Sequence, residues 1–327
     1  MSGLKSQRFR AEREADWKRL EGLLAKAEGG RATRLAAGEL MEIPVLYRAT
    51  ISALSVARAT SLDASLVAYL EALATRAYFF VYGARTNVAE SLARFFRIGW
   101  PTAVRALWRE TLAATAILAL ATLAGFALVW SNPDWYGSIL PGALAEGRDP
   151  TATTAFLREV LYKQPKGAGL SFFATFLFTH NAGVSILAFA LGFAFCVPTV
   201  LLVADNGLTL GALLALYGSR GLGGPIGGWL AIHGTTELFA TVLAAAAGFR
   251  IGWAVIFPGP RSRLEAASAA ARIAGAAMAG VVIMLIAAGV LEGVGRQTIR
   301  LDWARYAIGA AMLGLWLAYF YLPREEK

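Results

Sequence analysis

The chain has 327 residues, of which 57% are hydrophobic and only 16% are charged, and its formal net charge is +9. A soluble domain carries about 25% charged residues, so this composition argues against an ordinary soluble protein and indicates a membrane protein. No basic stripe with interleaved aromatic residues is present, and basic residues flanking membrane spans explain the charge, so we expect no nucleic-acid partner. The single cysteine, Cys196, excludes a disulfide framework within one chain.

Residues 1–107 are predicted to form a cytoplasmic or membrane-peripheral helical region. Apolar residues recur there at helical spacing among charged ones. The predicted helical stretches are Trp17 to Leu24, Glu42 to Arg58 and Leu62 to Tyr82. The polar N-terminus lacks the apolar segment of a signal peptide, so none is expected. A further stretch, Val88 to Ile98, alternates aromatic residues with arginines and is predicted to be an amphipathic helix at the membrane surface.

Residues 108–327 are predicted to form the membrane domain, because they contain long apolar runs with little charge. The predicted spans are Leu112–Trp130, Val184–Val203, Trp229–Ile256, Ala269–Leu291 and Tyr306–Leu322. Leu208–Tyr217 is too short to cross alone and runs into the glycine-rich segment 218–225, which favours a broken or re-entrant helix. The predicted fold is therefore an all-α, polytopic helical membrane bundle of about six spans, one of them broken or re-entrant.

Arginine placement predicts the orientation. The N-terminal region is basic, and residues 250–272 contain four arginines, so both belong in the cytoplasm by the positive-inside rule. Six crossings place both termini inside, provided that residues 208–256 cross twice. A re-entrant first part would instead move the C-terminus outside. The small residues Gly275, Gly280, Gly309 and Gly314 are predicted to allow close helix approach.

His233 and Glu237 stand four residues apart within an apolar segment and therefore share one helix face, with Gly234 between them. A charged side chain in the bilayer needs a partner, a water-filled cavity or a boundary position. We favour a buried hydrogen-bonded pair, and a proton-coupling site or a boundary position remains open. Metal binding is less favoured, because most sites need three ligands and His180 is the one other imidazole. We therefore expect no metal and no cofactor.

Three further polar positions lie beside the spans. Asn181 and Asn206 bracket the second predicted span, and capping of helix ends is the favoured role for both. Asn206 with Gly207 is predicted to form a turn. Glu292 follows an apolar run directly, so it is predicted to be an interfacial carboxylate, with an inward-facing partner of an arginine such as Arg220 as the alternative. These positions and the His233–Glu237 segment form one candidate polar membrane site.

No catalytic set is present in the sequence. It contains no GxSxG motif, no phosphate loop and no GxGxxG motif after a strand, and residues 221–228 lack the Lys-Ser/Thr pair of a phosphate loop. We therefore expect a protein that is not an enzyme. A membrane enzyme acting on lipid or cell-wall precursors is the least favoured alternative.

The polar segments together resemble the stage II sporulation protein M family of bacterial membrane proteins. Phe176 to Asn181 is similar to that family's aromatic stretch ending in an Asn pair, although His180 stands where the first Asn is expected. Asn206-Gly207 with Gly211 is similar to its Asn/Gly turn, and residues 233–237 are similar to its His-Gly-x-x-Glu segment. Glu292 after an apolar run also fits, and the likeness covers nearly the whole chain.

The resemblance implies a multi-pass protein of the bacterial cytoplasmic membrane with a partner-binding role. The founding type of the family takes part in engulfment and scaffolds peptidoglycan-degrading partners. We therefore predict a non-enzymatic scaffold that recruits other membrane or envelope proteins, or a second copy of itself, through its N-terminal helices and its outer loop at 131–169. The alternative is a transporter or channel component that uses His233 and Glu237 as a midplane site beside the broken helix.

Overall fold

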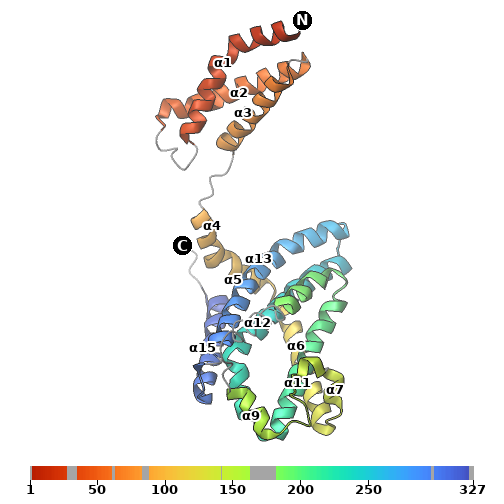
Figure 1. Ribbon diagram of the computed structural model, residues 1–327. Helices are drawn as coiled ribbons and strands as arrows, with labels where there is room; N and C mark the ends of the chain where they lie inside the picture. Colours follow the sequence, from red (N-terminus) through yellow and green to blue (C-terminus); the bar gives the residue numbers. More distant parts are fainter. Residues whose placement is uncertain are drawn as a thin grey trace. The chain divides into compact units, whose positions relative to one another are not determined.

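The computed structural model confirms the all-α class and describes residues 2–27, 35–60, 63–82, 88–140, 142–162, 182–295 and 298–323. No β-strand occurs among these residues. The chain divides into two compact units, Met1–Ser91 and Leu92–Lys327 (Figure 1). The boundary predicted after residue 107 separates a cytoplasmic or membrane-peripheral region from the membrane domain. The division into compact units concerns packing and not the membrane surface, so that boundary stays a prediction.

The N-terminal unit is a bundle of three long helices, α1 (Ser2–Ala27), α2 (Ala37–Ala59) and α3 (Ala64–Tyr82). Its core contains the expected apolar side chains of α1, among them Trp17, Leu20 and Leu24, which are at most 1% exposed. Ion pairs join charged side chains on its surface. They link Arg19 to Glu42, Lys26 to Glu39, and Arg58 to Glu71, at 2.7–3.0 Å. A core of large side chains under a charged surface is the arrangement that water favours.

The second unit contains the remaining helices. They are α4 (Val88–Arg94), which includes the boundary between the units, the π-helix η2 (Phe95–Gly99), α5 (Trp100–Ala106), α6 (Trp108–Ser131), α7 (Trp135–Ile139), α8 (Gly142–Ala145), α9 (Thr154–Tyr162), the short apolar helix Ala182–Phe193 ending in the 3-10 turn η3 (Leu191–Phe193), α11 (Val197–Ser219), α12 (Gly223–Ile256), α13 (Arg263–Val290), the π-helix η4 (Leu291–Gly295) and α15 (Asp302–Tyr321). The predicted surface helix over 88–98 is thus part of a helical segment that continues to Ala106.

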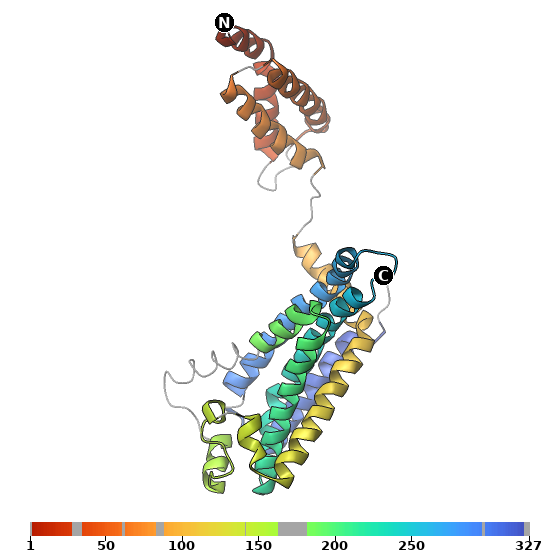
Figure 2. The same ribbon diagram turned by 90° about the vertical axis from the view of Figure 1, so that its right-hand side faces the viewer.

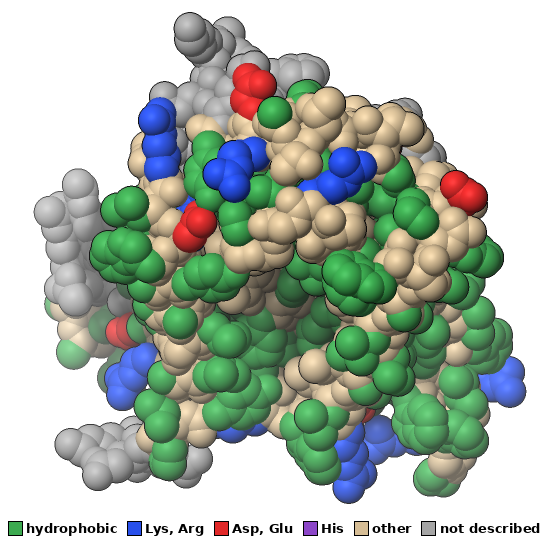
Figure 3. Space-filling model, turned by 90° about the horizontal axis from the view of Figure 1, so that it is seen from below, with side chains coloured by type: hydrophobic (Ala, Val, Ile, Leu, Met, Phe, Trp, Pro, Cys, Tyr) green, Lys and Arg blue, Asp and Glu red, His purple; other side chains and the backbone are tan. Residues whose placement is uncertain are grey.

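Six helices among the described residues are long and apolar enough to cross a membrane, and the chain is a multi-pass membrane protein. Four of these helices lie in the second unit: α6, α11, α12, and α13 with η4. The other two, α2 and α3, belong to the N-terminal unit and have the lowest hydropathy of the six, 1.3 and 1.2. The view from the end that carries α7 and α9 shows hydrophobic side chains spread widely over the surface, with charged groups in small separate patches (Figure 3).

The structure corrects the prediction of a broken helix at 208–228. Residues 208–217 belong to α11, a continuous helix of 23 residues that is long enough to span. The break lies earlier, at residues 191–196, where Phe195 and Cys196 have φ of 58° and 66°. The predicted span Val184–Val203 is therefore divided there. The hydroxyl of Thr199 donates to the carbonyl oxygen of Ala188 at 2.7 Å across the break, so one carbonyl released by it has a donor.

The prediction of a turn at Asn206-Gly207 is also wrong, because both residues lie in the middle of α11. A Cβ on Gly207 would lie 2.7 Å from the carbonyl oxygen of Leu118 on α6. A Cβ on Gly211 would overlap the backbone of Thr122, which also lies on α6. The two glycines let α6 and α11 approach closely, so tertiary packing overrides the local turn preference. Asn206 consequently caps no helix end.

Placing a Cβ on each of the four glycines that were predicted to allow close approach separates them into two pairs. A Cβ on Gly280 would overlap the ring of Trp100, and one on Gly309 would overlap the backbone of Ala231, so these two glycines mark real close contacts. No described atom lies within 4 Å of the Cβ positions of Gly275 and Gly314. Spacing in the sequence identified small residues but could not distinguish a helix contact from an open face.

The long helices run side by side along the second unit, and their ends gather at its two opposite ends (Figure 2). At one end Trp108 of α6, Val200 of α11 and Trp253 of α12 line a common pocket. At the other end Trp130 approaches Gly218, and the Tyr306 hydroxyl donates to the carbonyl oxygen of Gly224 at 2.9 Å. Helices α6 and α11 therefore run parallel, and α12 runs opposite to both.

Candidate functional site

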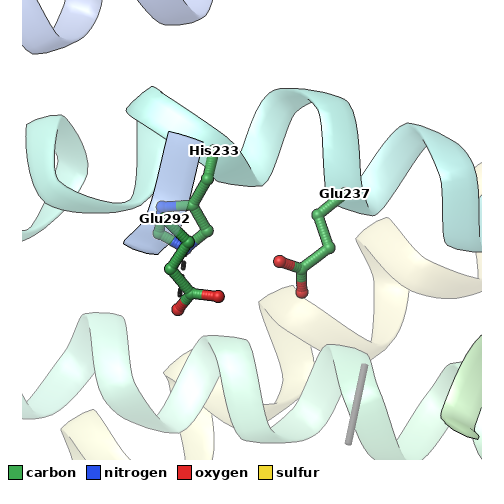
Figure 4. Close-up of side chains that lie close together, drawn as sticks. All are labelled: His233, Glu237 and Glu292. Atoms are coloured by element: carbon green, nitrogen blue, oxygen red, sulfur yellow. Dashed lines mark ion pairs between the residues drawn. The ribbon is translucent and has the colours of Figure 1, made fainter. Parts of the chain in front are cut away.

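The second unit holds a polar cluster inside its helical packing, formed by His233, Glu237 and Glu292. His233 and Glu237 lie one turn apart on α12, and Glu292 lies on η4 (Figure 4). His233 and Glu292 are each 5% exposed, and Glu237 is half-buried. His233 Nε2 lies 3.7 Å from Glu292 Oε1, and one ligand atom from each of the three residues lies within 4.8 Å of the others. We call these three residues the polar cluster.

The position of α12 explains the burial of the cluster. This helix has 34 residues and packs against α6, α11, α13 and α15. At 1.5 Å per residue it is about 51 Å long, well above the hydrocarbon thickness of about 30 Å. His233 lies about 15 Å from its start at Gly223, so a hydrocarbon core centred on α12 includes both His233 and Glu237. The polar cluster therefore lies among membrane helices rather than beyond them.

Hydrogen bonds fix the segment between the two polar residues of α12. The Thr235 hydroxyl donates to the carbonyl oxygen of Gly309 on α15 at 3.1 Å. The indole N–H of Trp316, also on α15, donates to the Thr236 hydroxyl at 3.2 Å. A Cβ on Gly234 would meet one described atom within 4 Å, on Leu230 at 4.0 Å, so the described packing does not explain a glycine there. These hydrogen bonds to α15 fix the rotation of α12 about its own axis. They therefore fix the direction of the face that carries His233 and Glu237.

A pocket of about 380 Å³ adjoins the cluster between α11 and α12. Asn206, Thr209 and three leucines of α11 line one side, and His233, Gly234 and Glu237 are among the lining residues of α12. The Trp229 ring meets the His233 ring edge to face, with centroids 5.7 Å apart. The pocket gives the cluster a space in which water or a small solute can reach the imidazole and one carboxylate.

The structure brings together five of the seven predicted site residues. Asn206, His233, Gly234 and Glu237 line one pocket, and Glu292 contacts the same histidine. Gly207 instead packs against α6. Asn181 lies outside the described residues.

Glu292 differs from its predicted role as an interfacial carboxylate. It is buried, and its Oε1 lies 3.7 Å from Nε2 of His233. Arg220, the proposed partner, donates to the carbonyl oxygen of Pro150. Trp229 was missed by sequence reasoning, although its position four residues before His233 on a helix could have indicated it.

The cluster offers one imidazole and two carboxylates to anything that binds among them. These groups exchange protons or ligate cations, and an ionisable group inside a membrane bundle is a functional-site hypothesis by default. No serine, cysteine or lysine nucleophile belongs to the set of described residues that line the pocket. The arrangement of one imidazole and two carboxylates can bind a proton or a cation.

Comparison with known proteins gives two family matches. The model described as stage II sporulation protein M matches residues 114–295, and a model described as a domain of unknown function (DUF8413) matches residues 7–83. No curated protein and no solved structure matches the chain. The first match covers more than half of the chain and contains Asn206 and the whole polar cluster. The chain therefore belongs to the stage II sporulation protein M family.

Proposed function

We propose that this protein is a non-enzymatic scaffold of the bacterial cytoplasmic membrane, which recruits partner proteins through its N-terminal unit on the cytoplasmic side. The observation that supports this is a groove of about 420 Å³ between α2 and α3 in that unit. Ile51, Tyr78 and Phe79 line it and are 41%, 49% and 66% exposed. Exposed apolar patches bordered by polar residues are typical of protein-binding sites.

The groove suits an amphipathic helix as the partner segment. Its apolar side chains follow one face of each of two neighbouring helices, which is the usual floor of a helix-binding groove. The ion pair between Arg58 and Glu71 lies along its lining and offers charged groups to polar side chains of the incoming helix. The charged surface of α1 and α2 supports a location of this unit in water rather than in lipid.

A photo-crosslinking amino acid at Phe79 tests the scaffold in growing cells. We expect one discrete adduct of defined mass, and none with the same probe at Lys18 on α1, whose side chain is 70% exposed. The captured protein, once purified, should bind the full chain, and Phe79→Asp should weaken that binding at least tenfold. No adduct at Phe79, or adducts with lipid alone, would overturn the proposal.

The polar cluster and its pocket favour a second candidate, a transporter or channel component that moves protons or cations. The full chain in liposomes should then release an imposed proton or cation gradient, and Glu237→Gln should abolish the release. Glu110→Gln is the matched control, because Glu110 is a partly buried carboxylate paired with Arg250 elsewhere in the same unit. If the wild-type chain leaves every imposed gradient unchanged, for protons and for each common cation tested, this candidate is contradicted.

A further inference from the structure

We infer that the polar cluster binds a divalent first-row transition-metal cation such as Zn²⁺ or Mn²⁺. This inference goes beyond the scaffold and names an ion class for the site of the second candidate, yet it holds without transport, since such an ion serves equally as a fixed brace between helices or as a transported solute. The sequence disfavoured a metal because most sites need three ligands and His180 is the one other imidazole. Glu292 supplies the third ligand from another helix.

The distances suit such an ion. Bonds of about 2.1 Å in tetrahedral geometry place ligand atoms about 3.4 Å from one another. The observed separation of His233 Nε2 and Glu292 Oε1 is 3.7 Å, and all three ligand atoms lie within 4.8 Å of one another. Figure 4 shows the carboxylate of Glu237 directed toward the His233–Glu292 pair.

Charge favours a divalent ion. Two carboxylates in one buried cluster repel each other strongly, because the surrounding helices screen charge poorly. A divalent cation between Glu237 and Glu292 neutralises both and leaves the imidazole neutral, the form in which histidine ligates metals. An imidazole together with carboxylates favours zinc, manganese or iron over calcium and magnesium, which prefer oxygen ligands.

The backbone at Glu292 provides a second, independent observation. Glu292 lies in η4, a single π-helical turn that follows α13. Such turns are rare and occur frequently at functional sites, because the wider turn changes the direction of a side chain. Here it contains the carboxylate that faces His233. Metal sites in helical bundles are commonly built from inward-facing Glu and His side chains on neighbouring helices.

The pocket supplies the remaining coordination position. It adjoins His233 and Glu237, so water or a small anion can occupy an open site on the ion. Asn206 lines the same pocket from α11, and its side-chain amide can hydrogen-bond to such a ligand. In this arrangement Asn206 orients the ligand in the open coordination position. That role replaces the helix capping predicted from the sequence.

Equilibrium binding to the full chain in detergent tests the inference without measuring flux or partner capture. After chelator treatment and dialysis, we expect one Zn²⁺ or Mn²⁺ per chain by calorimetry and elemental analysis, and much weaker binding of Mg²⁺ and Ca²⁺. Glu292→Gln, Glu237→Gln and His233→Asn should each weaken binding at least tenfold, whereas Glu110→Gln should not.

A measurement on the wild-type chain avoids dependence on variants that fold poorly. Electron spin-echo spectroscopy of bound Mn²⁺ should show nitrogen modulation from one imidazole. Absence of Zn²⁺ and Mn²⁺ binding, binding that Glu292→Gln leaves intact, or bound Mn²⁺ without nitrogen coupling would each overturn the inference. A scaffold or transport assay could fail independently of all three results.

Discussion

The two units differ in the side chains that hold their long helices together. The N-terminal unit buries Trp17 and several leucines and carries its charges outside. In the second unit α12 is buried through the alanines at 244–247, while large apolar side chains such as Leu120, Leu123 and Leu201 are about two-thirds exposed. Water drives large apolar groups inward, whereas lipid accepts them at the surface and leaves close packing of small residues to hold helices together.

The difference also explains where polar groups occur. In the N-terminal unit, charged side chains pair across the surface, where each exposed pair contributes little. In the second unit His233, Glu237 and Glu292 meet inside the helical packing, where ionisable groups are costly and need partners. The comparison therefore directs attention to the polar cluster for ion chemistry and to the α2–α3 groove for partner binding.

The largest expected effect tests whether the units are independent. Trp17→Ala removes a side chain that is 1% exposed and should lower the unfolding free energy of the N-terminal unit by about 3–5 kcal/mol. Hydrogen exchange of the full chain should show lost protection in α1–α3 and unchanged protection in α12. Met41→Ala, at a residue 77% exposed, is the control and should change neither. An equal loss of protection in α12 would contradict the division into units.

A smaller effect tests packing by small residues in the second unit. Gly211→Ala places a methyl group against the α6 backbone and should destabilise the folded protein by about 1–3 kcal/mol. Gly314→Ala faces open space and should be neutral or stabilising, because alanine favours a helix over glycine by about 1 kcal/mol. Thermal loss of monodisperse protein in detergent measures both. Equal melting temperatures for the two variants would show that glycine contacts do not hold α6 to α11.

The smallest expected effect concerns the surface charges of the N-terminal unit. The hydrogen bond from Arg19 lowers the pKa of Glu42 below the ordinary value of 4.5, and that from Lys26 lowers the pKa of Glu39. A depressed folded-state pKa stabilises the unit above about pH 4.5, and this contribution is lost as pH falls through the lowered pKa. The protection of α1 and α2, taken as hydrogen exchange relative to the intrinsic rate at each pH, should therefore fall modestly below that pH.

Salt and substitution sharpen this last expectation. Because these groups are exposed, the pH effect should shrink in high salt. Glu42→Gln should reduce the pH dependence in the N-terminal unit and leave exchange in α12 unchanged. If Glu42→Gln leaves the pH dependence intact, groups other than Glu42 cause it.

Much of the fold was predictable because composition and length govern it. The span predicted at Leu112–Trp130 lies within α6, and that at Trp229–Ile256 lies within α12, since a long, predominantly apolar run is stable in lipid only as a helix. The break was misplaced for an equally physical reason. Asn206 and Gly207 favour a turn locally, but close contact with α6 rewards a continuous helix, and no local pattern records that contact.

By itself the sequence determined that the chain is a multi-helix membrane protein, and that His233 and Glu237 share a helix face, because helical spacing fixes neighbours one turn apart. Only the tertiary structure decided that Glu292 faces His233, that Asn206 lines their pocket, and that Gly207 belongs to a helix contact instead. These relations join residues on different helices. They depend on how α11, α12 and α13 pack, which the periodicity of each helix does not specify.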